Sequence, residues 1–298
     1  MTARDLTEPA GAVAQGRKPD WLRVRFRRSE DYFEVAQTLR MLGLHTVCEE
    51  AHCPNSAECW GRRTATFMIL GDLCTRSCRF CAVKSARRGR PVDPAEPARL
   101  AEAVRRLGVR YVVLTSVDRD DLLDGGAGHF ARCVRAIKEA SPESRVEVLI
   151  PDFNGELEPL RMVVQSRPDV IGHNVETVER LQSRVRDPRA SYRTSLEVLE
   201  EVKRLNPSIH TKSSLMVGLG ESQDEVLETL RDLRSRGVEI VTIGQYLQPS
   251  RRHIPVAEYV KPEVFERFRV MAEELGFSHV YSGPLVRSSY HAAELFQA

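Results

Sequence analysis

Short apolar runs alternate with amphipathic stretches along most of the chain, and this pattern predicts an α/β fold. Six of the apolar runs are rich in β-branched residues, which is typical of strands buried on both faces of a parallel sheet. The stretches between them repeat apolar residues at helical spacing. Six β/α units over about 180 residues are too many for a small doubly wound sheet, so we predict a partial (β/α)6 barrel of the TIM type.

The expected strands and helices alternate along the chain. A helix over residues 32–42, with Phe33, Ala36, Leu39 and Leu42 at helical spacing, precedes the first strand. The strands are expected at residues 66–70, 111–115, 146–150, 170–173, 211–217 and 240–245. The later helices are expected at residues 94–107, 128–140, 158–165, 195–205, 222–236 and 262–275.

The chain is expected to divide into four segments. Residues 1–20, rich in Ala, Gly, Pro and polar groups, are predicted to be a disordered N-terminal arm. Residues 21–65 form an N-terminal extension that contains three cysteines, and residues 66–275 form the barrel. Residues 276–298 form an irregular C-terminal tail, and we expect both extensions to cover the mouth of the barrel.

The composition excludes several classes of protein. The 298 residues include 44 Lys and Arg against 42 Asp and Glu, and a net charge of +2 gives no footprint for a nucleic acid. The longest stretch without Asp, Glu, Lys or Arg, residues 275–286, is shorter than the ~20 apolar residues of a membrane span. The first residues include Asp5 and Glu8 and no apolar core, so we expect no secretory signal and a cytoplasmic protein. No motif requires a second chain, so we expect a monomer.

Cysteine is the most informative residue type in the sequence. Six of the seven cysteines fall within residues 48–81, and an odd number without a secretory signal argues against a disulfide framework. Such crowding in a reducing compartment indicates metal binding. The seventh, Cys133, lies in a predicted helix and is expected to be a buried apolar residue. The other six form two triads, Cys48-x4-Cys53-x5-Cys59 and Cys74-x3-Cys78-x2-Cys81.

Three thiolates on one short loop suit an iron–sulfur cluster better than zinc. Zinc sites favour two close pairs of ligands, and no pairing works cleanly here because each group offers three thiolates. A cubane cluster has four irons, of which a loop can hold three while the fourth stays open or is held from elsewhere. A Cys3His zinc site formed by the first triad with His45 or His52 is the alternative.

Several polar residues follow the predicted strands at their carboxyl ends, where parallel β/α folds place their active sites. The second triad belongs to this group, because Cys74 comes four residues after the strand 66–70. We therefore expect the triad and the polar residues to surround one mouth. The polar residues are Ser116, Asp118, Asp152, Asn154, His173, Asn174, Glu176, Glu221, Gln245 and Gln248.

The second triad carries a family resemblance. With Phe80 before its last cysteine and a strand before its first, it resembles the signature of the radical S-adenosylmethionine (SAM) superfamily. The first triad and the tail motif Arg287-Ser288-Ser289-Tyr290 resemble the lipoyl synthase family within that superfamily. Segments 115–122, 173–177, 216–221 and 245–250 also resemble that family, so the likeness runs from Trp21 to His291.

The resemblance implies a reaction, cofactors and partners. Members of that family insert sulfur at C6 and C8 of an octanoyl chain on a lysine of a carrier protein, which makes the lipoyl cofactor. These carbons are unactivated, so no general base removes their protons, and a cofactor must supply a radical. The implied cofactors are SAM and two [4Fe–4S] clusters, of which the auxiliary one donates the sulfur. The implied partners are octanoylated lipoyl carrier proteins (the glycine-cleavage H protein and the lipoyl domains of E2 acyltransferases), a ferredoxin or flavodoxin, and an iron–sulfur carrier.

The same resemblance implies the site residues. Cys74, Cys78 and Cys81 hold the SAM-binding cluster, whereas Cys48, Cys53 and Cys59 hold the auxiliary cluster. Ser289, or its neighbour Ser288, is the fourth auxiliary ligand, and its hard oxygen is a weaker ligand than thiolate, which lets an iron leave. Because an unpaired charge inside an apolar strand is expensive, Lys212 reaches a carboxylate, either of SAM or of a neighbouring Glu. The implied SAM contacts are Phe80, Ser116, Asp118, Asn174, Glu176 and Lys212.

Three other functions compete with this interpretation. Biotin-synthase-like and methylthiotransferase-like enzymes share the radical SAM triad, but the first triad and the tail motif argue against both. An electron-transfer protein with two cubanes needs eight ligands, usually cysteines, and the chain has seven. A zinc-stabilised scaffold is the third alternative, and iron content distinguishes it.

Overall fold

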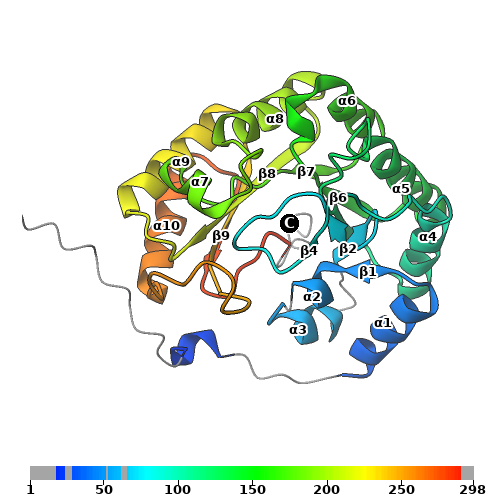
Figure 1. The fold of residues 1–298 in the computed structure, drawn as a ribbon, viewed down its shortest axis with the longest axis horizontal. Coiled ribbons are helices and arrows are strands. Elements are labelled where there is room, and N and C mark those ends of the chain that lie inside the picture. Colours follow the sequence, from blue (N-terminus) through cyan, green and yellow to red (C-terminus); the bar gives the residue numbers. More distant parts are fainter. Residues whose placement is uncertain (1–17, 24–28, 52, 62–65, 290–298) are drawn as a thin grey trace, which may run out of the picture.

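The computed structural model describes residues 18–23, 29–51, 53–61 and 66–289. Its main sheet is a partial barrel, which Figure 1 shows from one end. Strands β2 to β10 of this sheet pair in parallel, and β1 adds one antiparallel strand at the edge. The order is β1 (His45–Thr46), β2 (Thr66–Ile69), β5 (Tyr111–Ser116), β6 (Arg145–Leu149), β7 (Val170–Gly172), β8 (His210–Val217), β9 (Ile240–Gln245) and β10 (His279–Gly283). A small separate ribbon pairs β3 (Leu73–Cys74) with β4 (Lys84–Ser85).

Helices surround the outside of the barrel (Figure 1). The covering helices are α4 (Glu96–Leu107), α5 (Ala127–Ala140), α6 (Leu157–Gln165), α8 (Tyr192–Leu205), α9 (Gln223–Ser235) and α10 (Pro262–Glu274). Before β2 lie α1 (Glu30–Met41), α2 (Val47–Glu50) and α3 (Ser56–Gly61), and α7 (Gln182–Val185) follows β7. Short 3-10 turns occur at Asp20–Leu22, Phe153–Gly155 and Glu179–Leu181.

Local sequence signals set the helix ends. Ser222 caps α9 through a capping box, in which the Ser222 side chain accepts from the backbone N–H of Glu225 and the Glu225 side chain accepts in return. At the other end of a helix, α4 stops at Gly108, whose φ of +59° suits glycine. Longer connections follow β2, β7 and β9, which end at Ile69, Gly172 and Gln245, whereas α4, α8 and α10 begin at Glu96, Tyr192 and Pro262.

The core lies between the sheet and its helices. Val112 and Leu114 of β5 and Val148 of β6 are fully buried, as are Leu100 of α4 and Ile137 of α5. Burial of each such aliphatic side chain contributes about 1.5–3 kcal/mol. A second cluster of buried apolar residues joins β8 and β9 to α9 and α10. The two clusters hold the strands in register and fix where their carboxyl ends point.

All six predicted strands are present, and the predicted fold is confirmed. The expectation of an irregular tail after residue 275 is wrong in part, because β10 extends the sheet into that segment. The residues of β10 are only half-buried and include Ser282 and Gly283, so they lack an apolar signal. The predicted arm falls mostly on residues 1–17, outside the described part of the chain. Within the described residues, no helix has the length and apolar character needed to cross a membrane.

Candidate cluster and cofactor site

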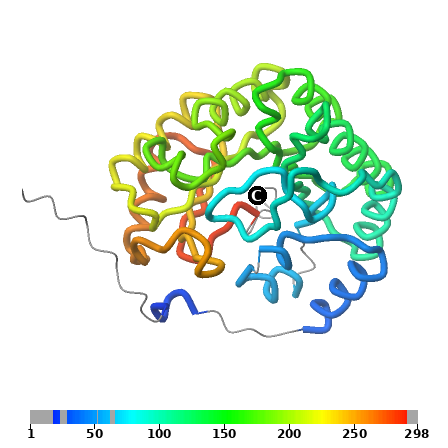
Figure 2. The backbone as a smooth tube through the Cα atoms, in the orientation of Figure 1, coloured from blue at the N-terminus to red at the C-terminus, as the bar shows by residue number. Residues whose placement is uncertain are grey.

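A cavity of about 530 Å³ opens at the carboxyl ends of the strands and brings both cysteine groups together. Cys48 and Cys53 lie on one part of its lining, and all three cysteines of the second triad lie on another. The tail enters the same cavity with Ser288 and Ser289. In Figure 2 the C-terminal tube runs to the middle of the ring, where the loop of the second triad crosses it. The other predicted residues in the lining are Phe80, Ser116, Asp118, Asn174 and Glu176.

The loop of the second triad leaves β2 through a tight reversal. Leu70 and Gly71 have φ values of +67° and +86°, and Thr75 then bonds back to the end of β5, its N–H donating to the Asp118 carbonyl at 3.0 Å. Backbone N–H groups also face the sulfur atoms. Arg76 N donates to Cys74 Sγ at 3.4 Å, and Asp187 N donates to Cys78 Sγ at 3.3 Å. Such N–H···S bonds orient thiolates for a metal.

Arg76, between the first two cysteines, anchors this loop to the ends of β5 and β6. Its side chain is 3% exposed and its Nη1 and Nη2 donate to the Asp152 carboxylate at 2.7 and 2.6 Å. Nε and Nη2 donate to Asp120 at 3.1 and 2.9 Å. Burial raises the pKa of Asp120 and Asp152, but the hydrogen bonds and the charge of Arg76, together with smaller contributions from other neighbours, hold both values below the usual range. The loop is therefore fixed by a doubly bidentate arginine.

Asp118 has a different environment from its two acidic neighbours. Its side chain is 25% exposed in the cavity, 3.4 Å from Arg76 Nε and 3.9 Å from Cys74 Sγ. Burial raises the pKa of Asp118 to about 6; Arg76 opposes this, and the charges of Asp152 and Asp120 add to it. A carboxylate with little compensation, facing a cavity, suits a cationic ligand group.

Ser116 and Glu176 also carry signs of an unmet partner. The Ser116 hydroxyl is buried and has no hydrogen-bond partner among the described residues. Glu176 has a φ of +66°, a strained conformation for a non-glycine residue, and its carboxylate accepts from Asn174 Nδ2 at 3.1 Å. Burial raises the pKa of Glu176, with Arg186 opposing. Strain and an orphaned hydroxyl at one cavity are typical of a ligand site.

The first triad is built on short helices beside the tail. Cys48 lies in α2, Cys59 in α3 and Cys53 between them, and Cys53 N donates to the Cys48 carbonyl at 3.1 Å. Asn55 Nδ2 donates to the Leu285 carbonyl at 2.7 Å, and Thr66 Oγ1 donates to Ser289 Oγ at 2.8 Å. The triad and the tail motif, far apart in sequence, are therefore tied together.

The donor set fits iron–sulfur clusters. All seven cysteines are free thiols. Burial raises the pKa of Cys48 and Cys78 to about 11 and that of Cys81 to about 12. At neutral pH these thiols therefore keep their protons until a bound metal displaces them. No three His, Cys, Asp or Glu side chains within the described ranges converge on a point suited to a single metal ion. His52, a ligand of the zinc alternative, and Tyr290 lie outside those ranges.

Comparisons with known proteins decide between the candidate classes. A profile of the radical SAM superfamily matches residues 68–233, and one of the N-terminal domain of lipoyl synthase matches residues 6–53. A lipoyl synthase of Anaeromyxobacter sp. is 59% identical over 280 residues, which cover 94% of this chain and 95% of the relative. The chain belongs to the lipoyl synthase family. A lipoyl synthase of Thermus thermophilus is 53% identical over 296 residues, covering 99% and 92%.

Solved structures agree with the fold of this lipoyl synthase family member. The FeFe-hydrogenase maturase HydG of Carboxydothermus hydrogenoformans has a TM-score of 0.53 at 13% identity, covering 88% of this chain and 77% of that chain. Coproporphyrinogen III oxidase of Escherichia coli, a radical SAM enzyme, has a TM-score of 0.52 at 11% identity, covering 70% and 52%. The lipoyl synthase family member is thus a radical SAM enzyme, and its cofactors are SAM and [4Fe–4S] clusters.

One predicted cofactor contact needs correction. Lys212 does not line the cavity; its Nζ lies 2.9 Å from Glu147 Oε1, and both side chains are 3% exposed. Tyr111 donates to the same carboxylate at 2.6 Å. Lys212 stands near the amino end of β8, away from the mouth. The sequence allowed Lys212 to pair with a carboxylate of SAM or of a neighbouring Glu, and in the structure its partner is Glu147.

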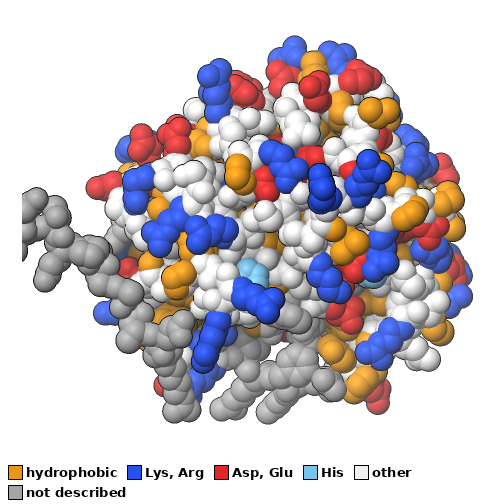
Figure 3. All heavy atoms as spheres, in the orientation of Figure 1, with side chains coloured by type: hydrophobic (Ala, Val, Ile, Leu, Met, Phe, Trp, Pro, Cys, Tyr) orange, Lys and Arg blue, Asp and Glu red, His pale blue; other side chains and the backbone are white. Residues whose placement is uncertain are grey.

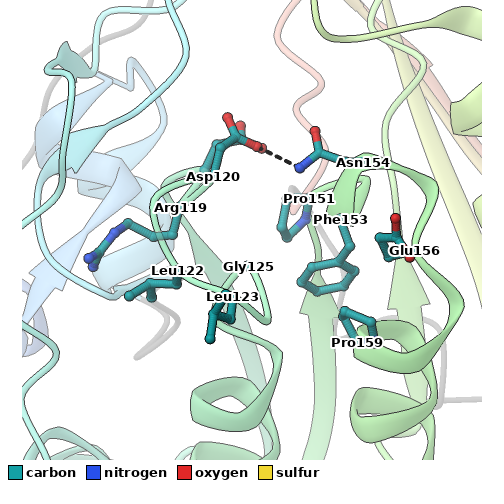
Figure 4. Close-up of a pocket in the computed structure, with 11 residues that line it drawn as sticks. Arg119, Asp120, Leu122, Leu123, Gly125, Pro151, Phe153, Asn154, Glu156 and Pro159 are labelled. Atoms are coloured by element: carbon teal, nitrogen blue, oxygen red, sulfur yellow. Dashed lines mark hydrogen bonds between the residues drawn. The ribbon is translucent and has the colours of Figure 1, made fainter.

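Arg76 and Asp120 were not predicted as site residues, whereas Asp118, Asp152 and Asn154 were expected at the mouth. Arg76 stands inside the triad, where the cysteines carry the sequence signal. A second, smaller pocket of about 50 Å³ lies beside this network. Figure 4 shows Asp120 and Asn154 facing each other across it, joined by a 3.2 Å hydrogen bond from Asn154 Nδ2. A buried arginine among three carboxylates becomes visible only when the strand ends are assembled.

Proposed function

We propose that this enzyme inserts two sulfur atoms, at C6 and C8, into an octanoyl chain bound to a lysine of a carrier protein. The observation that carries the proposal is one cavity lined by all three cysteines of the second triad and by Cys48 and Cys53 of the first, within a chain of the lipoyl synthase family. When bound, the clusters and SAM supply a radical that removes hydrogen from unactivated carbon, together with the sulfide that replaces it. A cavity of about 530 Å³ has room for a cofactor and an extended acyl chain.

We assign the two ligand sets by their place in the fold. Cys74, Cys78 and Cys81 would hold the SAM-binding cluster, because they share one loop and backbone N–H groups reach two of their sulfurs. Cys48, Cys53 and Cys59 would hold the auxiliary cluster.

Ser289 is the preferred fourth ligand of the auxiliary cluster, because Thr66 contacts both it and Cys48. The hydroxyl of Thr66 bonds to Ser289 Oγ at 2.8 Å. Burial raises the pKa of Cys48 to about 11, and the backbone N–H of Thr66 is the largest opposing effect. Ser288 lines the same cavity and remains the alternative.

The remaining cavity residues would hold SAM. The carboxylate of Asp118 and the unpartnered hydroxyl of Ser116 suit its amino group or ribose, and Glu176 with Asn174 offers a second polar pair. Phe80 lines the cavity and packs against the core of β8 and β9, which places an apolar ring where adenine can stack. No residue need act as general base, because the reacting carbons carry no acidic proton.

The proposed partners follow from the reaction. They are octanoylated carriers such as the glycine-cleavage H protein and E2 lipoyl domains, with a ferredoxin or flavodoxin as electron donor and an iron–sulfur carrier for rebuilding. We also propose that the enzyme acts as a cytoplasmic monomer.

The test is an anaerobic reaction of the iron- and sulfide-reconstituted enzyme with SAM, a strong reductant and an octanoylated carrier domain. The expected carrier product gains two sulfurs as a dithiol, and oxidation in air after the reaction then removes two hydrogens to form the cyclic disulfide. A mass spectrum resolves both forms, and deoxyadenosine forms alongside. Deoxyadenosine without a change in carrier mass would overturn the substrate while keeping radical SAM chemistry.

Iron analysis tests the ligand sets separately. Replacing all three cysteines of either triad with Ala should lower iron by about four atoms per chain, the content of one cubane. Cys133→Ala, which changes a buried cysteine of α5, is the matched control and should keep full iron. Full iron in either triple variant would contradict the assignment.

A further inference from the structure

Exposed positive charges gather around the mouth of the barrel. They come from three segments, residues 75–90, 183–190 and 249–253, whose only acidic residue is the buried Asp187. Because the whole chain has a net charge of only +2, this face is much more basic than the rest of the molecule. We define the basic rim as the exposed side chains of Arg79, Lys84, Arg87, Arg88, Arg90, Arg184, Arg189, Arg251 and Arg252.

Backbone contacts show that the three segments adjoin. Arg79 N donates to the Val185 carbonyl at 2.9 Å, and the Arg79 carbonyl accepts from Ile254 N at 3.1 Å. Arg189 Nη2 donates to the Thr75 carbonyl at 2.7 Å. Figure 3, in the orientation of Figure 1, shows Lys and Arg side chains around the middle of this face. The rim therefore forms one surface beside the entrance to the cavity.

Much of this charge is uncompensated. Arg90 and Lys84 pair with Asp72, and Arg189 pairs with Asp120 and Asp187. The other six rim arginines have no ion-pair partner among the described residues. Surface arginines without partners are free to interact with an incoming negative charge.

We propose that the basic rim docks the protein that carries the octanoyl-lysine, through an acidic surface around that lysine. This inference rests on the proposed function, because a chain tethered to a folded protein must enter the cavity from the face that the carrier contacts. The cysteine-bearing loop itself contributes Arg79, Lys84, Arg87 and Arg88, so the carrier would rest directly over the chemistry. Complementary charge of this kind speeds encounter and fixes orientation.

The test compares two double charge reversals. Arg87→Glu with Arg88→Glu changes the rim, whereas Arg135→Glu with Arg231→Glu makes the same charge change on the exposed faces of α5 and α9. Each variant receives an octanoylated carrier domain or a short peptide with an octanoyl-lysine. Dithionite supplies the electrons, so that no protein donor is needed.

The rim variant should raise the carrier-domain concentration that gives half the maximal single-turnover rate about tenfold at low salt, with the maximal rate and the peptide reaction unchanged. The effect should shrink above ~0.15 M salt, where exposed charges are screened beyond about 8 Å. The α5/α9 variant should behave like the parent. An equal loss with peptide and carrier would refute the proposal. An unchanged half-maximal carrier concentration would also refute it, if the reaction slowed only when a protein donor replaced dithionite. Failure of the parent enzyme on both substrates would instead refute the proposed function.

Discussion

Arg76→Met is the substitution whose effect follows most directly from the structure. It keeps an unbranched chain of similar length but removes the charge that faces Asp120 and Asp152. Asp152 has no exposed side-chain surface and Asp120 is 17% exposed, so neither carboxylate can recover full hydration. Leaving buried charges without their partner costs about 3–5 kcal/mol. We expect the free energy of unfolding to fall by that amount.

The assay is urea denaturation of the cluster-free protein under anaerobic, reducing conditions, which separates folding from metal binding. Adding Asp152→Asn to Arg76→Met should restore part of the loss, because it removes one of the stranded charges. Arg193→Met, at a pair with Glu197 where the arginine is 85% exposed, is the control and should change stability by under about 0.5 kcal/mol. A loss below about 1 kcal/mol for Arg76→Met would show that the network does not hold the loop.

Three further predictions address other parts of the barrel. Burial lowers the pKa of His173 to about 4 from 6.5, so the unfolded chain binds a proton first as pH falls. The contribution of His173 to the free energy of unfolding should be complete above pH 6.5 and decrease by up to about 3 kcal/mol toward pH 4. His173→Gln should flatten this pH dependence in a series of denaturation curves. Lys212→Met should destabilise the protein by about 3–5 kcal/mol, because it leaves the buried Glu147 carboxylate without its partner. Adding Glu147→Leu should restore most of that stability. Weaker SAM binding by the stable double variant would contradict a purely structural role for Lys212. Gly244→Ala places a Cβ 2.1 Å from the Val286 carbonyl oxygen, so it should displace the tail and lower the free energy of unfolding by about 1–3 kcal/mol. Iron should be lost selectively from the auxiliary cluster, and unchanged cluster spectra would argue against a contribution of the tail.

The strands were predictable because burial on both faces leaves a continuous apolar run. The runs that contain Val112 and Leu114, or Val241 and Ile243, are apolar in the sequence itself and fully buried in the structure. β10 gives none, since its side chains are half-buried and it joins the sheet only through pairing with β9. Its place depends on contacts with residues about forty positions away, which local periodicity does not contain.

The cavity residues were predictable from strand polarity, and the exception follows from the same rule. Ser116 is the last residue of β5, Asp118 and Asn174 follow their strands, and all three line the cavity. Lys212 is the third residue of an eight-residue strand, near its amino end, so the strand direction alone places it away from the mouth. Arg76 was beyond sequence reasoning, because its partners come from two other strand–helix connections, those after β5 and β6.

The bond between Thr66 and Ser289 joins residues 223 positions apart, and this separation sets an order of assembly during synthesis. Chains emerge amino end first, and their domains begin to fold while synthesis continues. The eight-residue loop from Cys74 to Cys81 is available as soon as β2 and its neighbours form. The cavity wall beside Cys48 includes the tail that follows β10, which leaves the ribosome after all the other described strands. A chain cut short before Arg287 keeps every cysteine but loses the segment that closes that wall.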